Sequence, residues 1–334
     1  MAVTAQAAGR LAEAERLYRA LQAAKPTSPT ALNLGLLLED QRRWAEAEAA
    51  YREGLAYDDP KDPVARRQLA FLRLRLGRYA EAWPDYEARM IKPGHNRKPP
   101  LSFPEWQGQP VGSLLIWHEQ GLGDQIQYAR YVRPLQARGV RVTLMCHPAL
   151  RRLFAPLGCQ VITAEGEKSN PAHDAWVQSA SLPWRMGTTL ETIPSAPYLP
   201  GRDGGTGTGL LTRGGAIHPD DHNRSMPDAA AAGLLALPGI RPLDRAATGA
   251  GDMEDTAEIV RGLEKVITGD TSLAHLAGAM GKPCWLLLPY KGDWRWLVGR
   301  TDSPWYPSIR IYRQERPGDW DAVVSRVVAD FHGA

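Results

Sequence analysis

The sequence has little cysteine, little phenylalanine and no large excess of charge of either sign. Its 334 residues include three Cys and four Phe, and 40 basic side chains are offset by 37 acidic ones, which gives a formal net charge of +3. A nucleic-acid-binding protein usually shows a strong basic excess, so this balance argues against that class. It leaves room for a local basic site that binds a phosphate.

The cysteines are Cys146, Cys159 and Cys284, which lie far apart in apolar surroundings. No two of them have the spacing of metal ligands. We expect buried thiols in a reducing compartment, with a disulfide as the second interpretation.

Long apolar runs are also absent. No stretch of about 18 apolar residues occurs, so we expect no membrane span. Residues 1–18 lack the continuous apolar core of a signal peptide, and we expect a cytoplasmic protein. The sequence also lacks a G-x-G-x-x-G fingerprint with an acidic residue about 20 positions later, which argues against an enzyme that binds a dinucleotide.

The first 92 residues contain a repeat. Three copies of Ala-Glu-Ala, each with a Tyr four residues after the second Ala, occur 33 and 35 residues apart. This period is that of a helix–turn–helix repeat of about 34 residues, in which small Ala residues let helices approach and Tyr fills the gap. The first copy is expected to lack its leading helix. The copies start at Ala12, Ala45 and Ala80, and Gly9, Arg42 and Gly77 stand three residues before them.

The pattern resembles the tetratricopeptide repeat, and a plain bundle of helical hairpins is the alternative. The Pro-rich residues 93–110 are expected to form an ordered linker, with Phe103 and Trp106 as anchors into the next domain; a solvated hinge is the other interpretation. Strand and helix patterns then alternate over residues 111–199 and again over 210–334, with a Gly-rich, flexible linker at 200–209. Such alternation predicts two α/β lobes with parallel sheets, whose ligands bind at the carboxyl ends of the strands.

The segment Trp117–Asp124 joins a predicted strand to a predicted helix. Gly121 and Gly123 let the backbone approach a ligand, and Asp124 falls in the first helical turn, where it could act as a cap or as a base that faces a cleft. His118, Glu119 and Gln120 cluster with it.

A second strand-to-helix junction begins at Asp270. With Thr271 and Ser272 it supplies a carboxylate, hydroxyls and unpaired backbone N–H groups, which together suit a phosphate. His275 on the next turn could reach a diphosphate or a ribose. The alternative is a plain N-cap with a packed His275.

Arg224 stands in a further strand-to-helix loop, His222–Pro227. It could pair with a phosphate through two parallel hydrogen bonds, or simply face solvent. The residues Trp294, Trp296 and Trp305 could line a sugar or base pocket, or pack between the lobes.

The order of these segments resembles a known group of enzymes. The motifs that carry the resemblance are WHEQGLGDQIQYARY at 117–131, TTLETIP at 188–194, NRSMP at 223–227, ITGDTSLAHLAGAMGKP at 267–283 and DWRWL…DSPWYPSIRIYRQ at 293–314. The chain is similar to tetratricopeptide-linked glycosyltransferases, to the ADP-heptose:lipopolysaccharide heptosyltransferases and more distantly to the O-linked N-acetylglucosamine transferases.

The resemblance implies a GT-B architecture, a metal-independent mechanism and no cofactor, since the nucleotide-sugar is a substrate. It implies that Asp124 is the general base in the acceptor lobe. It places Arg224, Asp270, Thr271, Ser272 and His275 at the donor, and His118, Glu119, Gln120, Gly121, Gly123 and Trp294 in an acceptor or sugar pocket. The implied partners are a nucleotide-sugar and a protein or glycan acceptor, recruited by the repeats.

One departure from the family pattern favours a second hypothesis. Between the helix that ends near Leu237 and the helix at Asp255, family members carry a further strand and a nucleotide-binding loop, whereas this chain has only a short segment with IRPLD. The alternative function is therefore a tetratricopeptide adaptor whose glycosyltransferase region binds without turnover.

Overall fold

The computed structural model describes residues 1–57, 62–91, 99, 101–165, 171–214 and 221–333. The chain divides into two compact units, Met1–Pro100 and Leu101–Ala334. Of the linker expected at 93–110, residues 93–98 and 100 lie outside the described part. Within the described ranges, no helix is both long enough and apolar enough to cross a membrane.

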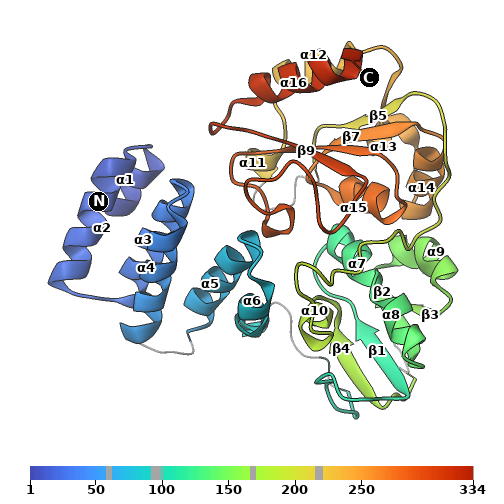
Figure 1. Ribbon diagram of the computed structural model, residues 1–334, viewed down its shortest axis with the longest axis horizontal. Coiled ribbons are helices and arrows are strands. Elements are labelled where there is room, and N and C mark those ends of the chain that lie inside the picture. Colours follow the sequence, from blue (N-terminus) through green and yellow to red (C-terminus); the bar gives the residue numbers. More distant parts are fainter. Residues whose placement is uncertain (58–61, 92–98, 100, 166–170, 215–220, 334) are drawn as a thin grey trace. The chain divides into compact units, whose positions relative to one another are not determined.

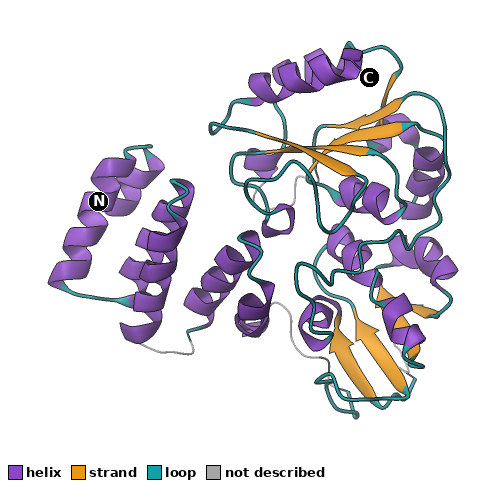
Figure 2. Ribbon diagram, viewed as in Figure 1, coloured by secondary structure: helices purple, strands orange, loops and turns teal. Residues whose placement is uncertain are grey.

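The first unit consists of helices that pair in chain order (Figures 1 and 2). The expected helix–turn–helix period is confirmed, but the expectation that the first copy lacks its leading helix is wrong, because the short helix α1 is present with Ala2 and Ala5 buried. The helices are α1 (Ala2–Ala7), α2 (Leu11–Ala24), α3 (Ser28–Asp40), α4 (Trp44–Tyr57), α5 (Pro63–Arg75) and α6 (Tyr79–Tyr86), followed by the 3-10 helix η1 (Glu87–Ile91).

The repeated residues occupy equivalent places in the three hairpins. The second Ala of each copy and its Tyr are buried, which is how the helices of a pair approach closely. The turn residue takes a positive φ each time, 72° at Gly9, 56° at Arg42 and 78° at Gly77, so the one non-glycine residue adopts the same left-handed conformation. The buried residues are Ala14, Ala47, Ala82, Tyr18, Tyr51 and Tyr86.

A set of ion pairs repeats with the hairpins. The arginine that follows the turn contacts a glutamate of its own helix and a second glutamate of the preceding hairpin, so it joins one hairpin to the next. Where that second glutamate would stand in the third hairpin, the chain has Trp83, which is buried, so this series ends there. The pairs are Arg43 with Glu46 and Glu15, and Arg78 with Glu81 and Glu48.

We expect Gly35→Ala to destabilise the first unit, because an added Cβ would lie 2.3 Å from Cε1 of Tyr51. Overpacking of this kind costs about 1–3 kcal/mol, more than the roughly 1 kcal/mol that Ala gains over Gly in a helix. Gly54→Ala is the matched control, since its Cβ would meet Ala31 at an ordinary 3.4 Å. Thermal unfolding should show a lower midpoint for the first variant and an equal or higher one for the second; equal losses would contradict this packing.

The second unit holds two α/β lobes, which we call lobe A (residues 101–199) and lobe B (residues 200–333). In lobe A four parallel strands lie in the order β3-β2-β1-β4, at places that the sequence predicts. The strands are β1 (Ser113–Trp117), β2 (Arg141–Cys146), β3 (Gln160–Thr163) and β4 (Ala175–Gln178), and the α-helices are α7 (Leu122–Ala129), α8 (Val132–Ala137), α9 (Arg151–Phe154) and α10 (Leu182–Arg185). Short 3-10 helices are η2 (Pro148–Leu150), η3 (Ala155–Leu157) and η4 (Ser179–Ser181).

Lobe B has a five-stranded parallel sheet in the order β6-β5-β7-β8-β9. The helices α12 and α16 pack on one face through a shared apolar cluster, and α14 and α15 lie on the other (Figure 1). The strands are β5 (Thr208–Leu211), β6 (Ile240–Pro242), β7 (Lys265–Gly269), β8 (Cys284–Leu288) and β9 (Ile309–Arg313). The helices are α11 (Asp221–Arg224), α12 (Asp228–Leu235), α13 (Arg245–Thr248), α14 (Met253–Arg261), α15 (Ser272–Ala279), η5 (Trp294–Trp296) and α16 (Trp320–Gly333).

The expected fold class is thus confirmed: a helical region is followed by an α/β region with two parallel sheets. The segment with IRPLD still forms a strand, β6, but one of only three residues at the sheet edge. Cys146 and Cys284 are buried thiols, and burial raises the pKa of the partly buried Cys159 to about 11.

The expected anchors of the linker dock on lobe A. Trp106 is buried, and its backbone N–H donates to the Trp176 carbonyl at 2.7 Å, beside strand β4. Phe103 packs on the cluster of Leu115, Met145 and Trp176. Both anchors therefore bind the start of the second unit to its first sheet.

The Gly-rich segment 200–209 lies against lobe B instead of standing free, in contrast to the flexible linker expected. The Lys282 ammonium donates to the carbonyls of Arg202 at 2.8 Å and Gly204 at 3.1 Å. Gly205 has a φ of 119°, and an added Cβ would lie 2.3 Å from the Leu263 carbonyl oxygen. Gly205 is therefore needed here for close backbone contact.

Candidate functional site

The helices that follow β1 and β7, which are α7 in lobe A and α15 in lobe B, pack against each other. An added Cβ at Gly123, in the first turn of α7, would lie 2.7 Å from Cδ2 of His275 and 3.4 Å from Cα of Ser272, at the start of α15. The sequence predicted that Gly123 allows close approach to a ligand. In the structure the close neighbour is the other lobe, so the two candidate segments meet directly.

Asp124 uses its two carboxylate oxygens differently. Oδ2 accepts from the Gly121 backbone N–H at 2.9 Å, which caps α7. Oδ1 accepts from Nη2 of Arg295, which belongs to lobe B, and the Asp124 side chain keeps 21% of its surface exposed. The capping role that the sequence offered for Asp124 is therefore present, and the second oxygen of the same side chain pairs with the other lobe.

Arg295 joins the lobes from the short helix η5. Its Nε donates to Oε1 of Gln127 at 2.6 Å, and its Nη1 donates to Oδ1 of Asp293 at 2.9 Å. Nη2 reaches Asp124 and, at 3.5 Å, Oε1 of Gln120. The guanidinium is nearly buried, with 8% of the side chain exposed, so it is a cation held between two lobes by polar partners from both.

The start of α15 has the geometry of an anion site. Thr271 is the N-cap residue, and its hydroxyl accepts from the Leu273 N–H at 3.3 Å. Ser272 is the first helical residue and is partly exposed. The first turn of a helix carries unpaired N–H groups and the positive end of the helix dipole, which favour a phosphate.

Arg224 lies beside this turn, at the end of α11. Its Nη1 donates to the Asp270 carbonyl at 3.0 Å, and an added Cβ on Gly214 would lie 2.4 Å from its Nη2. The loops that follow β5 and β7 thus bring Arg224 to the helix start, as the sequence-based hypothesis requires.

Asp270 is partly buried and crowded by charge. Burial and the nearby Asp293 carboxylate raise its pKa to about 7, while the Trp296 indole and the guanidiniums of Arg295 and Arg224 act in the opposite direction. A carboxyl group that titrates near neutral pH can give or accept a proton under physiological conditions.

His275 is buried between the lobes. Its Nδ1 lies 2.9 Å from the Tyr306 hydroxyl, and its ring lies 5.3 Å from that of Trp296. Burial and the charge of Arg295 lower its pKa to about 3, so the imidazole is neutral at pH 7. The structure thus places His275 in the packing between α7 and α15, where it supports the first turn of α15.

The other residues predicted near Asp124 have separate roles. The Glu119 carboxylate is buried and accepts from the Ala180 N–H at 2.8 Å, which ties the end of β1 to η4. His118 stacks on Trp117 with 6.4 Å between ring centroids. Gln120 is exposed and has a φ of 64°, an uncommon conformation outside glycine, in the turn before Gly121.

Trp294 packs in the interior instead of lining an open pocket. It is buried and meets Trp305 edge-on at 6.2 Å, and the Arg295 guanidinium lies over its ring. Trp296 and Trp305 are fully buried as well. Of the two interpretations that the sequence left open for these tryptophans, packing between the lobes describes their positions.

Sequence reasoning missed three polar residues of the site, namely Gln127, Asp293 and Arg295. Gln127 reads as an ordinary residue of an amphipathic helix, and Asp293 and Arg295 stand among tryptophans that drew attention to aromatic packing. Asp124 and Arg295 are 171 positions apart in the chain, so no local pattern joins them. One feature of the sequence could have indicated Asp293 and Arg295: two charged residues stand within an apolar segment that follows the buried strand β8, and charged residues in such a segment need partners.

No protein-family profile matches the chain. Among curated proteins it is similar to Protein FlbA of Caulobacter vibrioides, with 25% identity over 366 aligned positions that cover 89% of this chain. The chain spans 59% of the length of FlbA.

Similar solved structures include E. coli ADP-heptose lipopolysaccharide heptosyltransferase II, at 13% identity and a TM-score of 0.44, covering 67% of this chain and 99% of that one. They also include the glycosyltransferase TibC of enterotoxigenic E. coli, with 14% identity and a TM-score of 0.46, where the match covers 70% of this chain and 78% of TibC. The match to the O-GlcNAc transferase of Thermobaculum terrenum has 13% identity and a TM-score of 0.27, and it covers 99% of this chain and 90% of that one. Both families named from the sequence motifs are represented among these structures.

We expect Asp270→Asn to be more stable than the wild type at pH 8 and nearly equal to it at pH 4. Because the folded state raises the pKa of Asp270 from 3.8 to about 7, it retains a proton that the unfolded chain loses over this range, so stability falls as pH rises toward 7. The difference at pH 8 should be on the order of 4 kcal/mol, from a pKa difference of about three between the two states. Chemical unfolding at both pH values measures it, with the exposed Asp321→Asn as control; a loss that does not depend on pH would refute the assignment.

Proposed function

We propose that this chain is a metal-independent glycosyltransferase that moves a sugar from a nucleotide-sugar to a hydroxyl of a protein or glycan. The observation that carries the proposal is the contact of Gly123 with Ser272 and His275. It brings the Asp124 carboxylate of lobe A and the anion-binding turn of lobe B to one place.

In the proposed reaction, the Asp124 carboxylate accepts the proton of the acceptor hydroxyl. The acceptor oxygen forms a bond with the anomeric carbon of the sugar, and the bond from that carbon to the diphosphate oxygen breaks. The nucleoside diphosphate leaves with the electron pair. A positioned base contributes about 10²–10⁴-fold to such a reaction.

The leaving diphosphate needs positive charge and hydrogen-bond donors. In the proposed function these come from the N–H groups at the start of α15 and from Arg224 and Arg295. Donors fixed in advance, in a site with little water, stabilise developing charge without having to reorganise. The short strand β6 leaves fewer residues for nucleotide contacts, so most donor affinity is assigned to the diphosphate.

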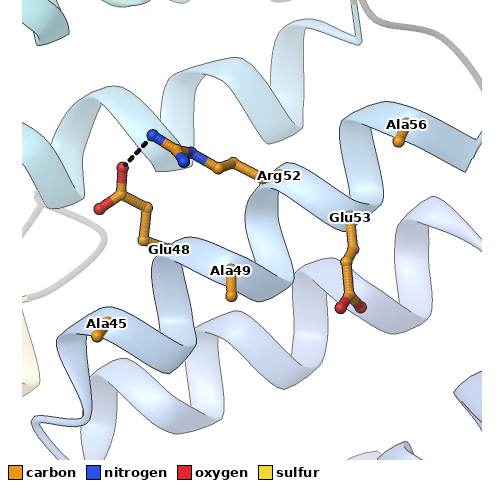
Figure 3. Close-up of a pocket in the computed structure, with 6 residues that line it drawn as sticks. All are labelled: Ala45, Glu48, Ala49, Arg52, Glu53 and Ala56. Carbon is orange, nitrogen blue, oxygen red and sulfur yellow. Dashed lines mark ion pairs between the residues drawn. The ribbon is translucent and has the colours of Figure 1, made fainter.

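Acceptor recruitment is assigned to the helical unit. An open groove runs along α4, and its floor consists of small alanine side chains flanked by charged groups that include the ion pair of Glu48 and Arg52 (Figure 3). Small side chains leave room for an extended peptide, and the charged groups offer polar contacts to it. The lining residues are Ala45, Glu48, Ala49, Arg52, Glu53 and Ala56.

Asp124→Asn should slow transfer strongly while leaving the fold intact, because the amide keeps an oxygen for the Gly121 cap but cannot accept the proton. The donor is found first by thermal shift with UDP, GDP, ADP, CMP and their sugars, since a ligand that binds only the native state raises the melting temperature. Turnover should then fall by about 10²-fold or more. The exposed Asp302→Asn is the control, and its turnover should stay at the wild-type level.

The same assay decides between the transferase and the adaptor. If the wild type and Asp124→Asn are equally inert with every donor, while the helical unit still binds a partner protein, the adaptor function stands and the transferase is refuted.

Recruitment by the groove has its own test. Ala45→Glu adds a charged side chain at an exposed position of the groove, and we expect the KM for the acceptor to rise several-fold without a change in donor hydrolysis. Ala12→Glu is the matched control, because Ala12 holds the equivalent exposed position of the first repeat, outside the groove. An equal KM in both variants would show that acceptors do not bind there.

A further inference from the structure

We propose that Arg295 is a partner-exchanging residue: its Nη2 pairs with Asp124 while the donor site is empty and transfers to the donor diphosphate when the donor binds, which frees the Asp124 carboxylate to act as the base. This inference rests on the proposed function and adds an order of events to it, with the donor binding before the base becomes available.

The hydrogen bonds of Arg295 divide into a fixed set and an exchangeable one. Nε and Nη1 are held by Gln127 at 2.6 Å and by Asp293 at 2.9 Å. The contacts to Asp124 and Gln120 both use Nη2. The guanidinium can therefore change its partner at one nitrogen while the other two keep it in place.

The first turn of α15 lies next to this ion pair. Arg295 pairs with Asp124, and the preceding residue, Gly123, would place an added Cβ 3.4 Å from Cα of Ser272 on that turn. Arg224 stands at the same turn, where its Nη1 donates to the Asp270 carbonyl at 3.0 Å. In the proposed function, a diphosphate bound at this turn would therefore meet both guanidiniums. A doubly or triply charged phosphate group competes for an arginine better than a single carboxylate does.

The ion pair of Arg295 and Asp124 has two consequences, one for the buried cation and one for the carboxylate. Asp293 is a permanent carboxylate partner of the buried guanidinium, and Asp124 provides a second one at Nη2 before the donor arrives. While Oδ1 of Asp124 is bound by Arg295, it is not available to the acceptor hydroxyl, so the acceptor would be activated only after the exchange.

The test is a double-mutant cycle with inorganic pyrophosphate as the probe, measured by calorimetry. Asp124→Asn should bind pyrophosphate about tenfold more tightly than the wild type, because Arg295 no longer has to leave a carboxylate; Arg295→Gln should bind it about tenfold more weakly. In the double variant the gain from Asp124→Asn should disappear. Arg295→Lys keeps the charge and serves as a second variant in case the Gln form does not fold.

Simple repulsion between Asp124 and the probe predicts a different result, namely that the gain persists without Arg295. That outcome, or an Asp124→Asn variant that binds pyrophosphate no better than the wild type, would overturn the proposal. Arg152→Ala removes another ion pair between the lobes, at Asp252 and Asp255, and should leave the affinity unchanged. Because the probe needs no turnover, a positive cycle together with no transfer would refute the transferase alone.

Discussion

The contact between the first turns of α7 and α15 is the constraint on which the candidate site depends. Glycine at position 123 lets one helix start lie against the side chain of His275 and the backbone of Ser272. Any larger residue would separate the two lobes at the point where their sheets end. Because the first turn of a helix carries unpaired N–H groups, this contact also brings two positive helix ends near each other, and the site must supply negative charge to balance them.

That negative charge comes from three carboxylates, and the structure controls each of them differently. Asp124 is neutralised by the Arg295 guanidinium, and Asp293 shares the same cation. Burial and the charge of Asp293 raise the pKa of Asp270 to about 7, so this third carboxyl group is only partly ionised at neutral pH. Arg295 is thus the residue through which the two lobes share charge. The neutral His275 adds none, which keeps the interface between the helices apolar.

The elements that could be predicted from the sequence are those with local signals. The repeat spacing predicted the helical hairpins, and the glycine, aspartate and hydroxyl residues after short apolar runs predicted the two helix starts. The partners between the lobes could not be predicted, because Arg295 meets Asp124 only through the tertiary fold. The sequence also could not show that Gly123 approaches the other lobe instead of a ligand. A glycine indicates that a neighbouring group comes close to the backbone, but it does not identify that group.

A second buried cation shows why the lobes meet as one body. Arg130, at the end of α7, lies over the rings of Tyr198, Trp305 and Tyr306 and donates to the Trp305 carbonyl at 2.7 Å. Among the described residues it has no carboxylate partner, so aromatic faces and carbonyl oxygens offset the cost of burying it. Arg130 and Arg295 both contact the α7 region, but they have different kinds of partner. The first is bound to neutral groups that a charged substrate would not displace, and the second to a carboxylate that an anion can replace. This difference assigns a structural role to Arg130 and leaves Arg295 as the cation that can respond to a ligand.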